Sequence, residues 1–422
     1  MKKEKVFRDP IHRYITVQDE FIWNLINTRA FQRLNNLHQL GGSYQIFHGA
    51  VHTRFGHALG TYAIAQEIYE KIPLIECITE YERKLLLATA LLHDLGHGPY
   101  SHAAESYLTL HHEATTAKII LEDKAIRKIL DTVDAKFASD IVAVLQKQYQ
   151  NPLLSKIISS QIDVDRMDYL LRDSYYAGVP YGDYDKDRII RVMRVQDNRL
   201  IFSETGVHVI ENFMLSRYHM HEQVYNNFKG KAFESLLKLS VLRFKQLWQE
   251  QAISTQKIYC LFAKFLATNK GSDIQHFLEF DDHMFMAVQH LFASENDTVL
   301  STIATNIISR QLPKVFEVTQ NDYEQIIEKL TTYRQQKHPL GFFVDADLEK
   351  EKPLIRKKEN DQINILRTNG EIVAVEALSP ILTALHQGAS QAKYYIYINN
   401  QIIKHDTDTW EQILEYNNFY NQ

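Results

Sequence analysis

The pattern of apolar and polar residues divides the chain into a strand-like beginning, a long helical body and a mixed end. Residues 5–18 alternate around Asp9-Pro10, which predicts two short strands joined by a turn. From Asp19 to about residue 336, apolar residues recur mostly at the three- and four-residue spacing of helices. Within this body we expect one short strand at Arg199–Ser203 and a long helix over about residues 231–250.

Beyond residue 337 the pattern predicts strands together with one short helix. Asn369-Gly370 is the turn signal of a hairpin, and Ser379-Pro380 is a helix start. The expected elements are strands at 340–344, 363–367, 372–375 and 394–398 and a helix that Gly388 ends. We therefore predict a mainly α fold, with a helical core and N-terminal strands over residues 1–336 and a small mixed α/β part over 337–422. The C-terminal part has no catalytic signature, so packing or oligomer contact is its expected role.

One predicted helix ends in a concentration of polar residues. It opens with the capping-box pattern Thr79-x-x-Glu82 and is apolar on every side up to Leu92, which predicts burial. The pair His93-Asp94 follows, and a buried imidazole and carboxylate are costly unless they are paired or bind a metal. Nine of the chain's 19 histidines lie between residues 38 and 112, which favours chemistry over a simple buried His-Asp pair.

The geometry beyond this helix decides which histidines meet. His93 and His97 share a face if the helix continues for one more turn. Gly96, Gly98 and Pro99 then interrupt the helix. His102 is expected to fold back towards the same point.

Composition narrows the class of protein. The chain has 422 residues, 45% hydrophobic and 23% charged, as in an ordinary soluble globular protein, and no apolar run is long enough for a bilayer. The N-terminus lacks the apolar core of a signal peptide, and two cysteines predict no disulfide framework, so we expect the cytoplasm. A net charge of −5 gives no strong nucleic-acid signal, so an anionic substrate would need local arginines and a metal.

Four segments offer metal ligands. Asp165, Tyr169 and Asp173 in one of them follow helical spacing and so share one face. Two imidazoles and two carboxylates suit a borderline first-row metal. The segments are His52–His57, His93-Asp94, Leu110–Glu113 and Asp163–Asp173.

Six motifs occur in order over roughly residues 5–230. They are Lys5-Val-Phe-x-Asp-Pro-Ile-His12, Phe31-Gln-Arg-Leu34, Gln39-Leu-Gly-Gly42, Arg54-Phe-x-His57, the run 93–102 and Asp163-Val-Asp-Arg-x-Asp-Tyr169. Together they resemble the HD-domain deoxynucleoside triphosphate (dNTP) triphosphohydrolases. The resemblance is to the branch that bacterial enzymes share with animal proteins pairing an HD domain with a sterile-alpha motif.

This resemblance implies a hydrolase that cleaves a dNTP to deoxynucleoside and inorganic triphosphate by water attack on the α-phosphate. It also implies allosteric control and a homo-oligomer, either a dimer or a tetramer. The implied cofactor is a divalent metal: manganese, iron, zinc or magnesium. The metal ligands implied are His57, His93, Asp94 and Asp165.

The resemblance also assigns roles around the phosphates. His102 would be the general acid that protonates the leaving 5′ oxygen, while His97 and His112 would hold α-phosphate oxygens. Glu105, three residues after His102, could orient it by helical spacing. Arginines bind phosphate oxygens in pairs, and those implied for the triphosphate tail are Arg54 and Arg166.

A further set is implied for the deoxyribose and its surroundings. Its members are Gln39, Leu40, Tyr169, Asp173, Arg217, His221 and Tyr225. The last three recur every four residues and predict one helical stripe. Tyr225 aligns with the aromatic residue that leaves no room for a 2′-OH, although in a chain with 23 tyrosines Tyr169 and Tyr225 alone would be ordinary core residues.

Other charged residues of the Asp163–Asp173 segment receive a structural interpretation. Asp163, Asp168 and Arg172 are expected to form ion pairs, the usual outcome for a charge run on a helix.

In activated members of the family, guanine nucleotides bind near the N-terminal strands and assemble the oligomer. The matching candidate regulatory residues are Lys5, Val6, Asn27, Gln32 and Arg33. The family's second basic residue is replaced here by Asn35, which offers no cationic fork to a phosphate. We therefore expect activation by guanine nucleotides to be weakened or altered in base preference, unless another basic residue such as Lys3 or Arg8 substitutes for it.

Two other functions are compatible with parts of this pattern. One is an HD phosphodiesterase acting on cyclic dinucleotides, an alarmone or single-stranded nucleic acid, against which the implied sugar pocket argues. The other is a catalytically idle nucleotide sensor, which the presence of every implied metal ligand and histidine disfavours.

Overall fold

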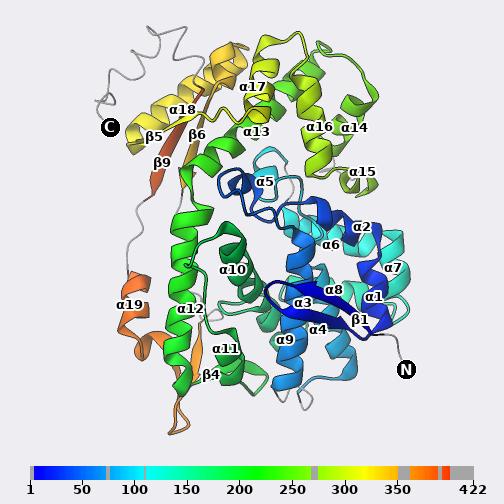
Figure 1. Ribbon diagram of the computed structural model, residues 1–422, viewed down its shortest axis with the longest axis vertical. Helices are drawn as coiled ribbons and strands as arrows, with labels where there is room; N and C mark the ends of the chain where they lie inside the picture. The colour runs from blue at the N-terminus through cyan, green and yellow to red at the C-terminus, as the bar shows by residue number, and fades with distance from the viewer. Residues whose placement is uncertain are drawn as a thin grey trace. The chain divides into compact units, whose positions relative to one another are not determined.

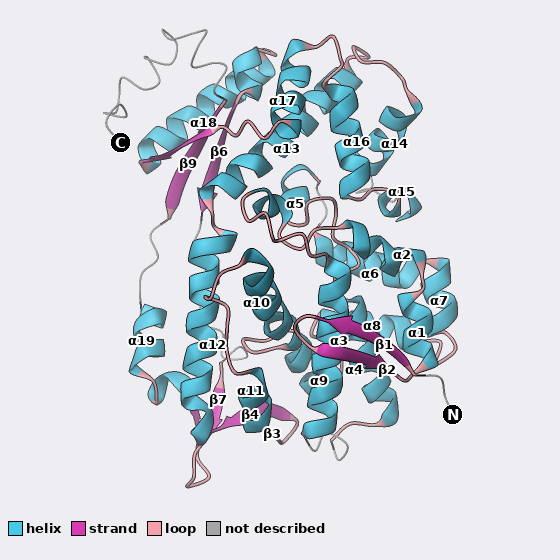
Figure 2. Cartoon of the chain, viewed as in Figure 1, coloured by secondary structure: helices cyan, strands magenta, loops and turns pink. Residues whose placement is uncertain are grey.

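The structure is a computed structural model that describes residues 4–72, 77–108, 111–267, 274–349, 362–387 and 392–399. Helices dominate these residues, as Figure 2 shows, and the mainly α fold with short N-terminal strands is confirmed. The chain divides into two compact units. Unit 1 takes residues 1–226, 265–282 and 353–389, and unit 2 takes 227–264, 283–352 and 390–422. The boundary expected between residues 336 and 337 does not coincide with this division, because each unit draws on both sides of it.

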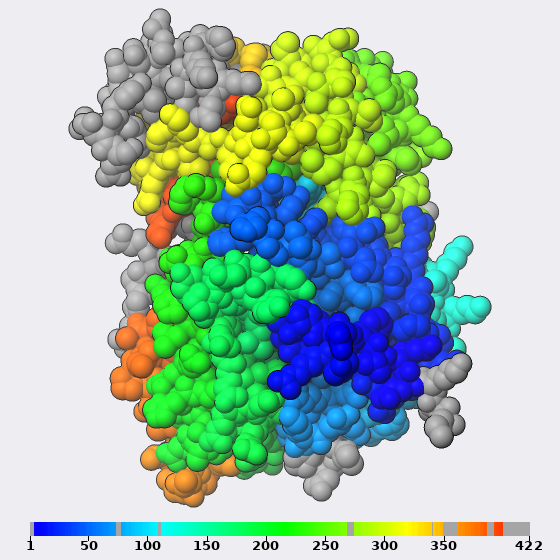
Figure 3. Space-filling view, viewed as in Figure 1, coloured from blue at the N-terminus to red at the C-terminus, as the bar shows by residue number. Residues whose placement is uncertain are grey.

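The N-terminal strands form the predicted hairpin at the surface of unit 1 (Figures 1 and 3). Strand β1 (Lys5–Asp9) pairs antiparallel with β2 (Arg13–Val17). Arg13 has a φ of 62°, and Asp9 Oδ1 accepts the backbone N–H groups of Ile11 and His12, both at 2.9 Å. This Asx turn reverses the chain at the expected place.

Three helices of unit 1 carry the residues of chemical interest. They are α3 (Arg54–Lys71), α4 (Glu80–Leu92) and α10 (Val164–Ala177). The capping box at the start of α4 is present as predicted, and the helix is buried along most of its length. Asp163 caps α10 through the backbone N–H of Arg166.

Helix α4 ends at Leu92 and does not continue for the further turn that would place His93 and His97 on one face. Thr116 of helix α6 (His112–Glu122) binds the backbone groups that another turn would need. Its Oγ1 accepts the Gly96 N–H at 2.9 Å and donates to the His93 carbonyl at 3.1 Å. A Cβ at Gly96 would lie 2.2 Å from the His112 carbonyl oxygen, so this close approach requires glycine. His93 and His97 therefore do not share a helical face.

The rest of unit 1 surrounds these helices. It contains α1 (Glu20–Ile26), α2 (Arg29–Gln32), η1 (Arg33–Asn36), η2 (Gly41–Gln45), α5 (Ala103–Tyr107), α7 (Lys124–Leu130), α8 (Phe137–Leu145), α9 (Pro152–Ile158), α11 (Lys186–Val192), η4 (Glu204–Gly206), α12 (Val207–Met220), the π-helical turn η5 (His221–Tyr225), α15 (Ile274–Leu278), η8 (Val375–Ala377) and α19 (Pro380–Gln387). Gly388, the expected end of the last helix, lies outside the described residues.

A four-stranded sheet in unit 1 has the order β3-β4-β7-β8. Strand β4 (Arg199–Ser203) and the hairpin of β7 (Asn364–Leu366) and β8 (Ile372–Ala374) were predicted, the latter with Gly370 at φ 86°. Strand β3 (Met193–Gln196) was not predicted. Its signal was the pair Asp197-Asn198, whose φ angles of 51° and 56° suit a two-residue hairpin turn.

Unit 2 combines helices with a three-stranded sheet of order β5-β9-β6. The long helix expected over 231–250 is α13 (Phe228–Gln249), and the strand expected at 394–398 is β9 (Lys393–Ile398). The other elements are α14 (Lys257–Leu266), α16 (Asp282–Phe292), α17 (Thr298–Ile308), β5 (Lys314–Val318), α18 (Gln320–Gln335), η6 (Pro339–Phe342) and β6 (Val344–Glu349).

Two details of unit 2 differ from the sequence prediction. The strand expected at 340–344 begins only at Val344, because the preceding residues form the 3₁₀ turn η6. Strand β5 lies inside the stretch predicted to be helical. Among the described helices, none is both long and apolar enough to cross a membrane.

Helices α3 and α10 pack closely at Gly60. A Cβ at this position would lie 1.8 Å from Oδ1 of Asp168, a fully buried carboxylate. Real Cβ atoms do not approach other atoms so closely. The space for Asp168 therefore depends on the missing side chain of Gly60.

We expect Gly60→Ala to destabilise the protein strongly, by about 3 kcal/mol or more, because the added methyl group displaces a buried paired carboxylate. The measurement is the thermal unfolding midpoint of the full chain. Gly178→Ala is the control: its φ of 70° adds strain, but a Cβ there meets nothing within 4 Å, so we expect only about 1–2 kcal/mol. A Gly60→Ala midpoint at or above that of Gly178→Ala would contradict this account.

Candidate active site

Two imidazoles and two carboxylates from three helices converge in unit 1. His57 lies on α3, His93 and Asp94 follow α4, and Asp165 lies on α10. His57 Nε2 lies 3.1 Å from Asp165 Oδ1 and 3.6 Å from Asp94 Oδ2. His93 Nε2 lies 3.3 Å from Asp94 Oδ1 and 3.6 Å from Asp165 Oδ1. The structure thus brings together the four residues named as metal ligands; their role as ligands remains a prediction.

The donor atoms of this group suit a divalent cation. The Nε2 atoms of His57 and His93 are buried and have no hydrogen-bond partner within the described part of the chain. His93 Nδ1 lies 2.9 Å from the Ala90 carbonyl, and that contact requires the proton on Nδ1, so the neutral ring has its lone pair on Nε2. Two nitrogen lone pairs beside two carboxylates form a ligand set typical of first-row metals.

Electrostatics in this group favour a bound cation. Burial disfavours a charged His57, but the nearby carboxylates of Asp165 and Asp168 outweigh it and raise the pKa of His57 to about 10. Burial likewise opposes the charge of Asp94, yet His93, Arg54 and His97 hold its pKa well below the usual value. The carboxylates therefore attract positive charge, and a divalent cation can take the place of the proton on His57.

Asp168 fixes the orientation of His57. Its Oδ2 lies 2.8 Å from His57 Nδ1, and Arg172 donates to both carboxylate oxygens, at 2.8 and 2.9 Å. His12 Nε2 lies 2.6 Å from Oδ1, and Arg172 also donates to Asp9 at 2.8 Å. The predicted Asp168–Arg172 ion pair is present, and the sequence did not reveal that it also holds an imidazole.

A second group contains three histidines. The rings of His97 and His112 are stacked with centroids 4.1 Å apart, and His102 lies edge-on to both, at 5.0 and 5.2 Å. His97 is buried, His112 is partly buried, and the His102 side chain is 66% exposed. Burial, followed by the charge of Arg54, holds the pKa of His97 well below its usual value. Their donor atoms are also close enough to hold a metal ion.

From its spacing, Glu105 of helix α5 was expected to orient His102, but its direct hydrogen bond is to another histidine. It hydrogen-bonds His112 Nδ1, whereas His102 Nδ1 lies 3.8 Å from its carboxylate. Burial opposes its charge, but His102 and His112 together hold the pKa of Glu105 well below the usual value. Glu105 is thus shared between the two histidines and makes its direct hydrogen bond to His112.

Asp94 connects the two groups. Its Oδ1 lies 3.3 Å from both His93 Nε2 and His97 Nε2. Its Oδ2 accepts a hydrogen bond from Arg54, whose Nε donates to Ser101 Oγ at 2.8 Å. The metal-ligand candidates and the three histidines therefore form one continuous polar site.

The residues proposed around the sugar lie beside this site. Asp173 accepts from the Tyr225 hydroxyl at 2.9 Å and contacts His52 Nε2 at 2.8 Å. The Tyr169 ring neighbours both Tyr225 and His57, with centroids 6.0 and 6.4 Å away. His52, a metal-ligand candidate from its segment, supports Asp173 instead.

Gln39 and Leu40 lie next to His52. The Gln39 N–H donates to the His52 carbonyl at 3.0 Å. The Gln39 side-chain oxygen is buried and has no hydrogen-bond partner in the described residues. Leu40 is buried and precedes η2. A buried amide oxygen without a partner is ready to accept from a ligand.

The predicted stripe of Arg217, His221 and Tyr225 is only partly regular. Helix α12 ends at Met220, and His221–Tyr225 form a π-helical turn that changes the angular spacing. The rings of His221 and Tyr225 nevertheless lie 5.1 Å apart, and Arg217 donates to Gln161 at 2.9 Å. Arg166, the other cation expected here, is paired with Asp163, while its buried Nε lacks a partner in the described chain.

The candidate regulatory residues do not form one cluster of available side chains. Lys5 lies over the Trp23 ring at 5.0 Å, Val6 is exposed, and Asn27 donates to the Trp23 carbonyl. Gln32 donates to the Ile26 carbonyl.

Arg33 has a structural function in this structure. It is 5% exposed and donates to the carbonyls of His97 and Phe280, at 2.9 and 2.8 Å. Two of its three guanidinium nitrogens are therefore bonded inside the protein, and nucleotide binding by these residues remains a prediction.

Comparison with known proteins places this site in a family. Residues 54–173 match the HD domain and residues 184–261 match the HD associated region. An uncharacterized protein, YwfO, from Bacillus subtilis is 36% identical over 415 residues, which is 96% of this chain and 94% of that protein. A relative from Dictyostelium discoideum, described as a deoxynucleoside triphosphate triphosphohydrolase SAMHD1 homolog, is 33% identical over 56% of this chain and 48% of its own length.

A solved structure agrees with this assignment. The crystal structure of a phosphohydrolase from Bacteroides thetaiotaomicron matches with a TM-score of 0.81 and 26% identity, over 94% of this chain and all of that one. The HD-domain match spans Asp165 together with His57, His93 and Asp94, whose ligand atoms lie close enough to hold a metal ion. The chain therefore belongs to the HD-domain family of metal-dependent phosphohydrolases and carries its HD-associated region.

Proposed function

We propose that this protein is a metal-dependent dNTP triphosphohydrolase that yields deoxynucleoside and inorganic triphosphate. The observation that carries the proposal is the double contact of Asp94, 3.3 Å from both His93 Nε2 and His97 Nε2. Because of it, a phosphate at the cation would lie beside the three histidines. Relatives described as dNTP triphosphohydrolases, at 33% identity in Dictyostelium discoideum and 24% in chicken, support the substrate class.

We assign a chemical role to each residue from its position and its exposure to solvent. His57, His93, Asp94 and Asp165 would hold the cation, which when bound lowers the pKa of water and supplies hydroxide near neutral pH. The leaving 5′ oxygen needs a proton, and we assign its delivery to His102, the most exposed of the three histidines.

The remaining polar side chains would hold the phosphates. His97 and His112 would donate hydrogen bonds to α-phosphate oxygens, with Glu105 orienting His112 through its hydrogen bond to Nδ1. Arg54 and Arg166 would bind the triphosphate tail. Each already pairs with one aspartate, so each guanidinium group is pre-oriented and offers its remaining N–H groups to phosphate oxygens.

The sugar pocket would favour deoxyribose. Gln39 and Asp173 would bind the 3′-OH, and Tyr169 would form a wall beside His57. Tyr225 is held by its hydrogen bond to Asp173, so its ring cannot easily move aside for a 2′-OH. Arg217 and His221 precede it on the same segment and would line the same pocket.

Loss of a metal-ligand carboxylate should remove the cation. We expect Asp94→Ala and Asp165→Ala to lose bound manganese while keeping their helical circular dichroism, because two imidazoles alone bind it weakly. Metal content after purification, measured by mass spectrometry, is the test. His102→Ala is the control and should retain metal. If the His102 variant loses metal and the two aspartate variants keep it, the cation belongs to the three-histidine group.

The position of bond cleavage can be read from isotopic oxygen. With dATP in ¹⁸O water, we expect the label in triphosphate and none in deoxyadenosine, because water adds to the α-phosphorus. His102→Gln should slow turnover by about 10²–10⁴-fold without moving the label. Label in a nucleoside monophosphate would instead show pyrophosphate release and favour a different HD phosphohydrolase activity.

Ribonucleotides should be poor substrates. A 2′-OH against Tyr225 would lose its water partner, which costs about 1–3 kcal/mol, or roughly 5- to 150-fold in kcat/KM. Steady-state kinetics on GTP and dGTP should show this gap, and Tyr225→Ala should narrow it. Tyr225→Phe keeps the ring but loses the hydrogen bond to Asp173, so it should keep more of the discrimination than Tyr225→Ala. Equal kcat/KM for the two nucleotides in the parent enzyme would rule out this pocket.

A further inference from the structure

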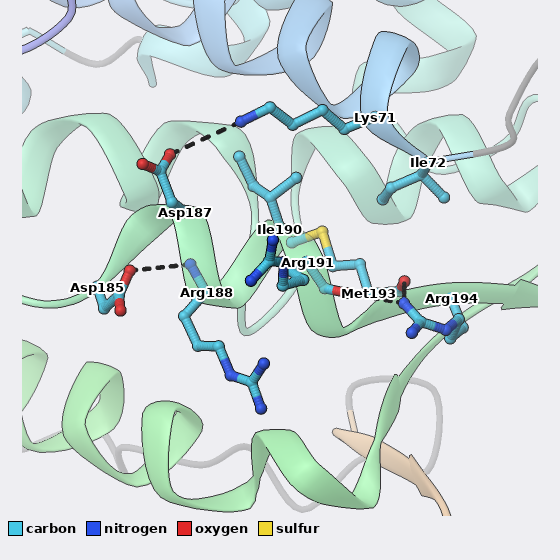
Figure 4. A pocket seen from close by; sticks show the side chains of 9 residues that line it. All are labelled: Lys71, Ile72, Asp185, Asp187, Arg188, Ile190, Arg191, Met193 and Arg194. Atoms are coloured by element: carbon cyan, nitrogen blue, oxygen red, sulfur yellow. Dashed lines mark hydrogen bonds and ion pairs between the residues drawn. The ribbon is translucent and has the colours of Figure 1, made fainter.

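We propose that unit 1 contains a second anion site, which binds a linear polyphosphate chain in a basic pocket away from the HD site. Figure 4 shows this pocket beside the end of α3, helix α11 and the start of β3. Its volume is ≈ 560 Å³, within the range of small-molecule sites. The charged residues at its walls are Lys71, Asp185, Asp187, Arg188, Arg191 and Arg194.

The positive charge of the pocket is not neutralised by its own acidic residues. No carboxylate pairs with the side chains of Arg188, Arg191 or Arg194 within the described part of the chain. Arg188 donates to the Thr205 carbonyl, and Arg194 donates to the carbonyls of residues 191 and 193, which orients these groups but leaves their charge.

The two aspartates are already engaged. Asp185 caps α11 through the Arg188 backbone N–H at 2.9 Å. Asp187 lies 3.4 Å from Lys186 and 3.8 Å from Lys71. The pocket is therefore lined by three arginines whose charge no carboxylate pairs with, a composition that attracts an anion.

The geometry favours a chain of phosphates over a single one. Arg188 and Arg191 are three residues apart on α11 and so lie on one face, and Arg194 follows on β3. Three guanidinium groups at one pocket offer more donors than a single phosphate can use, since each guanidinium group binds two oxygens. Three apolar residues, Ile72, Ile190 and Met193, also line the pocket and are at most 3% exposed.

This pocket is separate from the site at His57. His57 and Lys71 both lie on α3, 14 residues apart, which corresponds to about 21 Å along the helix axis. None of the residues proposed for the HD site lines the pocket. The inference thus does not depend on the proposed function, and binding can be measured without turnover.

Titration calorimetry with inorganic tripolyphosphate on the full chain tests the proposal. In the Asp165→Ala variant, which lacks a proposed metal ligand, we expect one bound tripolyphosphate. Adding Arg191→Ala and Arg194→Ala should weaken this binding about tenfold or more. Arg199→Ala, an exposed arginine on β4 outside the pocket, is the matched control and should change it little. Affinity unchanged by the double substitution, or no binding in the Asp165→Ala protein, would overturn the proposal.

Two further measurements test the charge argument and ask whether the bound phosphates belong to a free polyphosphate or to a nucleotide. Asp187→Asn removes a competing carboxylate and should tighten tripolyphosphate binding several-fold, a gain that structural damage cannot produce. Binding of dATP about as tight as tripolyphosphate would assign the site to the phosphates alone. Binding of dATP tenfold tighter would assign it to a nucleotide whose base uses the apolar residues. Weaker binding of tripolyphosphate by Asp187→Asn would contradict the charge argument.

Discussion

The buried carboxylate of Asp168 is the interaction on which the site most depends. It is fully buried and contacts three partners: Arg172, His57 and His12. A buried charge that loses a partner costs about 3–5 kcal/mol, so these residues are fixed relative to one another. Because Arg172 also bonds Asp9, the N-terminal hairpin is tied to the imidazole of His57 through two ion pairs. A loop more than forty residues earlier in the sequence thus helps to set the direction of a metal-ligand candidate.

A second constraint is the tight turn that follows α4. Tyr100 and Ser101 adopt φ angles of 59° and 57°, which are unfavourable for residues with side chains. The turn is held by the Tyr100 N–H bonding to Asp282 at 2.7 Å, and by the Ser101 hydroxyl bonding to the His38 carbonyl at 2.7 Å. Strained backbone persists where its surroundings determine it strongly. Here the strain places His102 next to the rings of His97 and His112, where an uninterrupted helix would carry it away.

The sequence revealed the helical core, the capped start of α4 and the residues that meet in the site, because these depend on local periodicity and on motif order. It did not reveal where α4 ends, since that depends on Thr116, a residue 20 positions beyond the glycine it contacts. It also missed the second function of Asp168, because a charged residue on a helix has the same sequence signal whether it pairs with an arginine or also orients a ligand. Strand β5 was missed for a similar reason: its pairing partner β9 lies far along the chain.

The two sites in unit 1 to which we assign ligands differ in the sign of their excess charge. Within the described part of the HD site, Arg54, Arg166 and Arg172 form ion pairs with its carboxylates, which number six: Asp9, Asp94, Asp163, Asp165, Asp168 and Asp173. That excess of negative charge is stable in a buried place only if further positive charge is present, either as protons on histidines or as a cation. The pocket beside α11 has the opposite excess, with guanidinium groups held by backbone carbonyls that leave their charge intact. Without a bound cation, the HD site would repel a phosphate chain. The pocket beside α11 would attract the same chain and needs no cation to do so. Metal occupancy should therefore decide which of the two sites a free polyphosphate occupies.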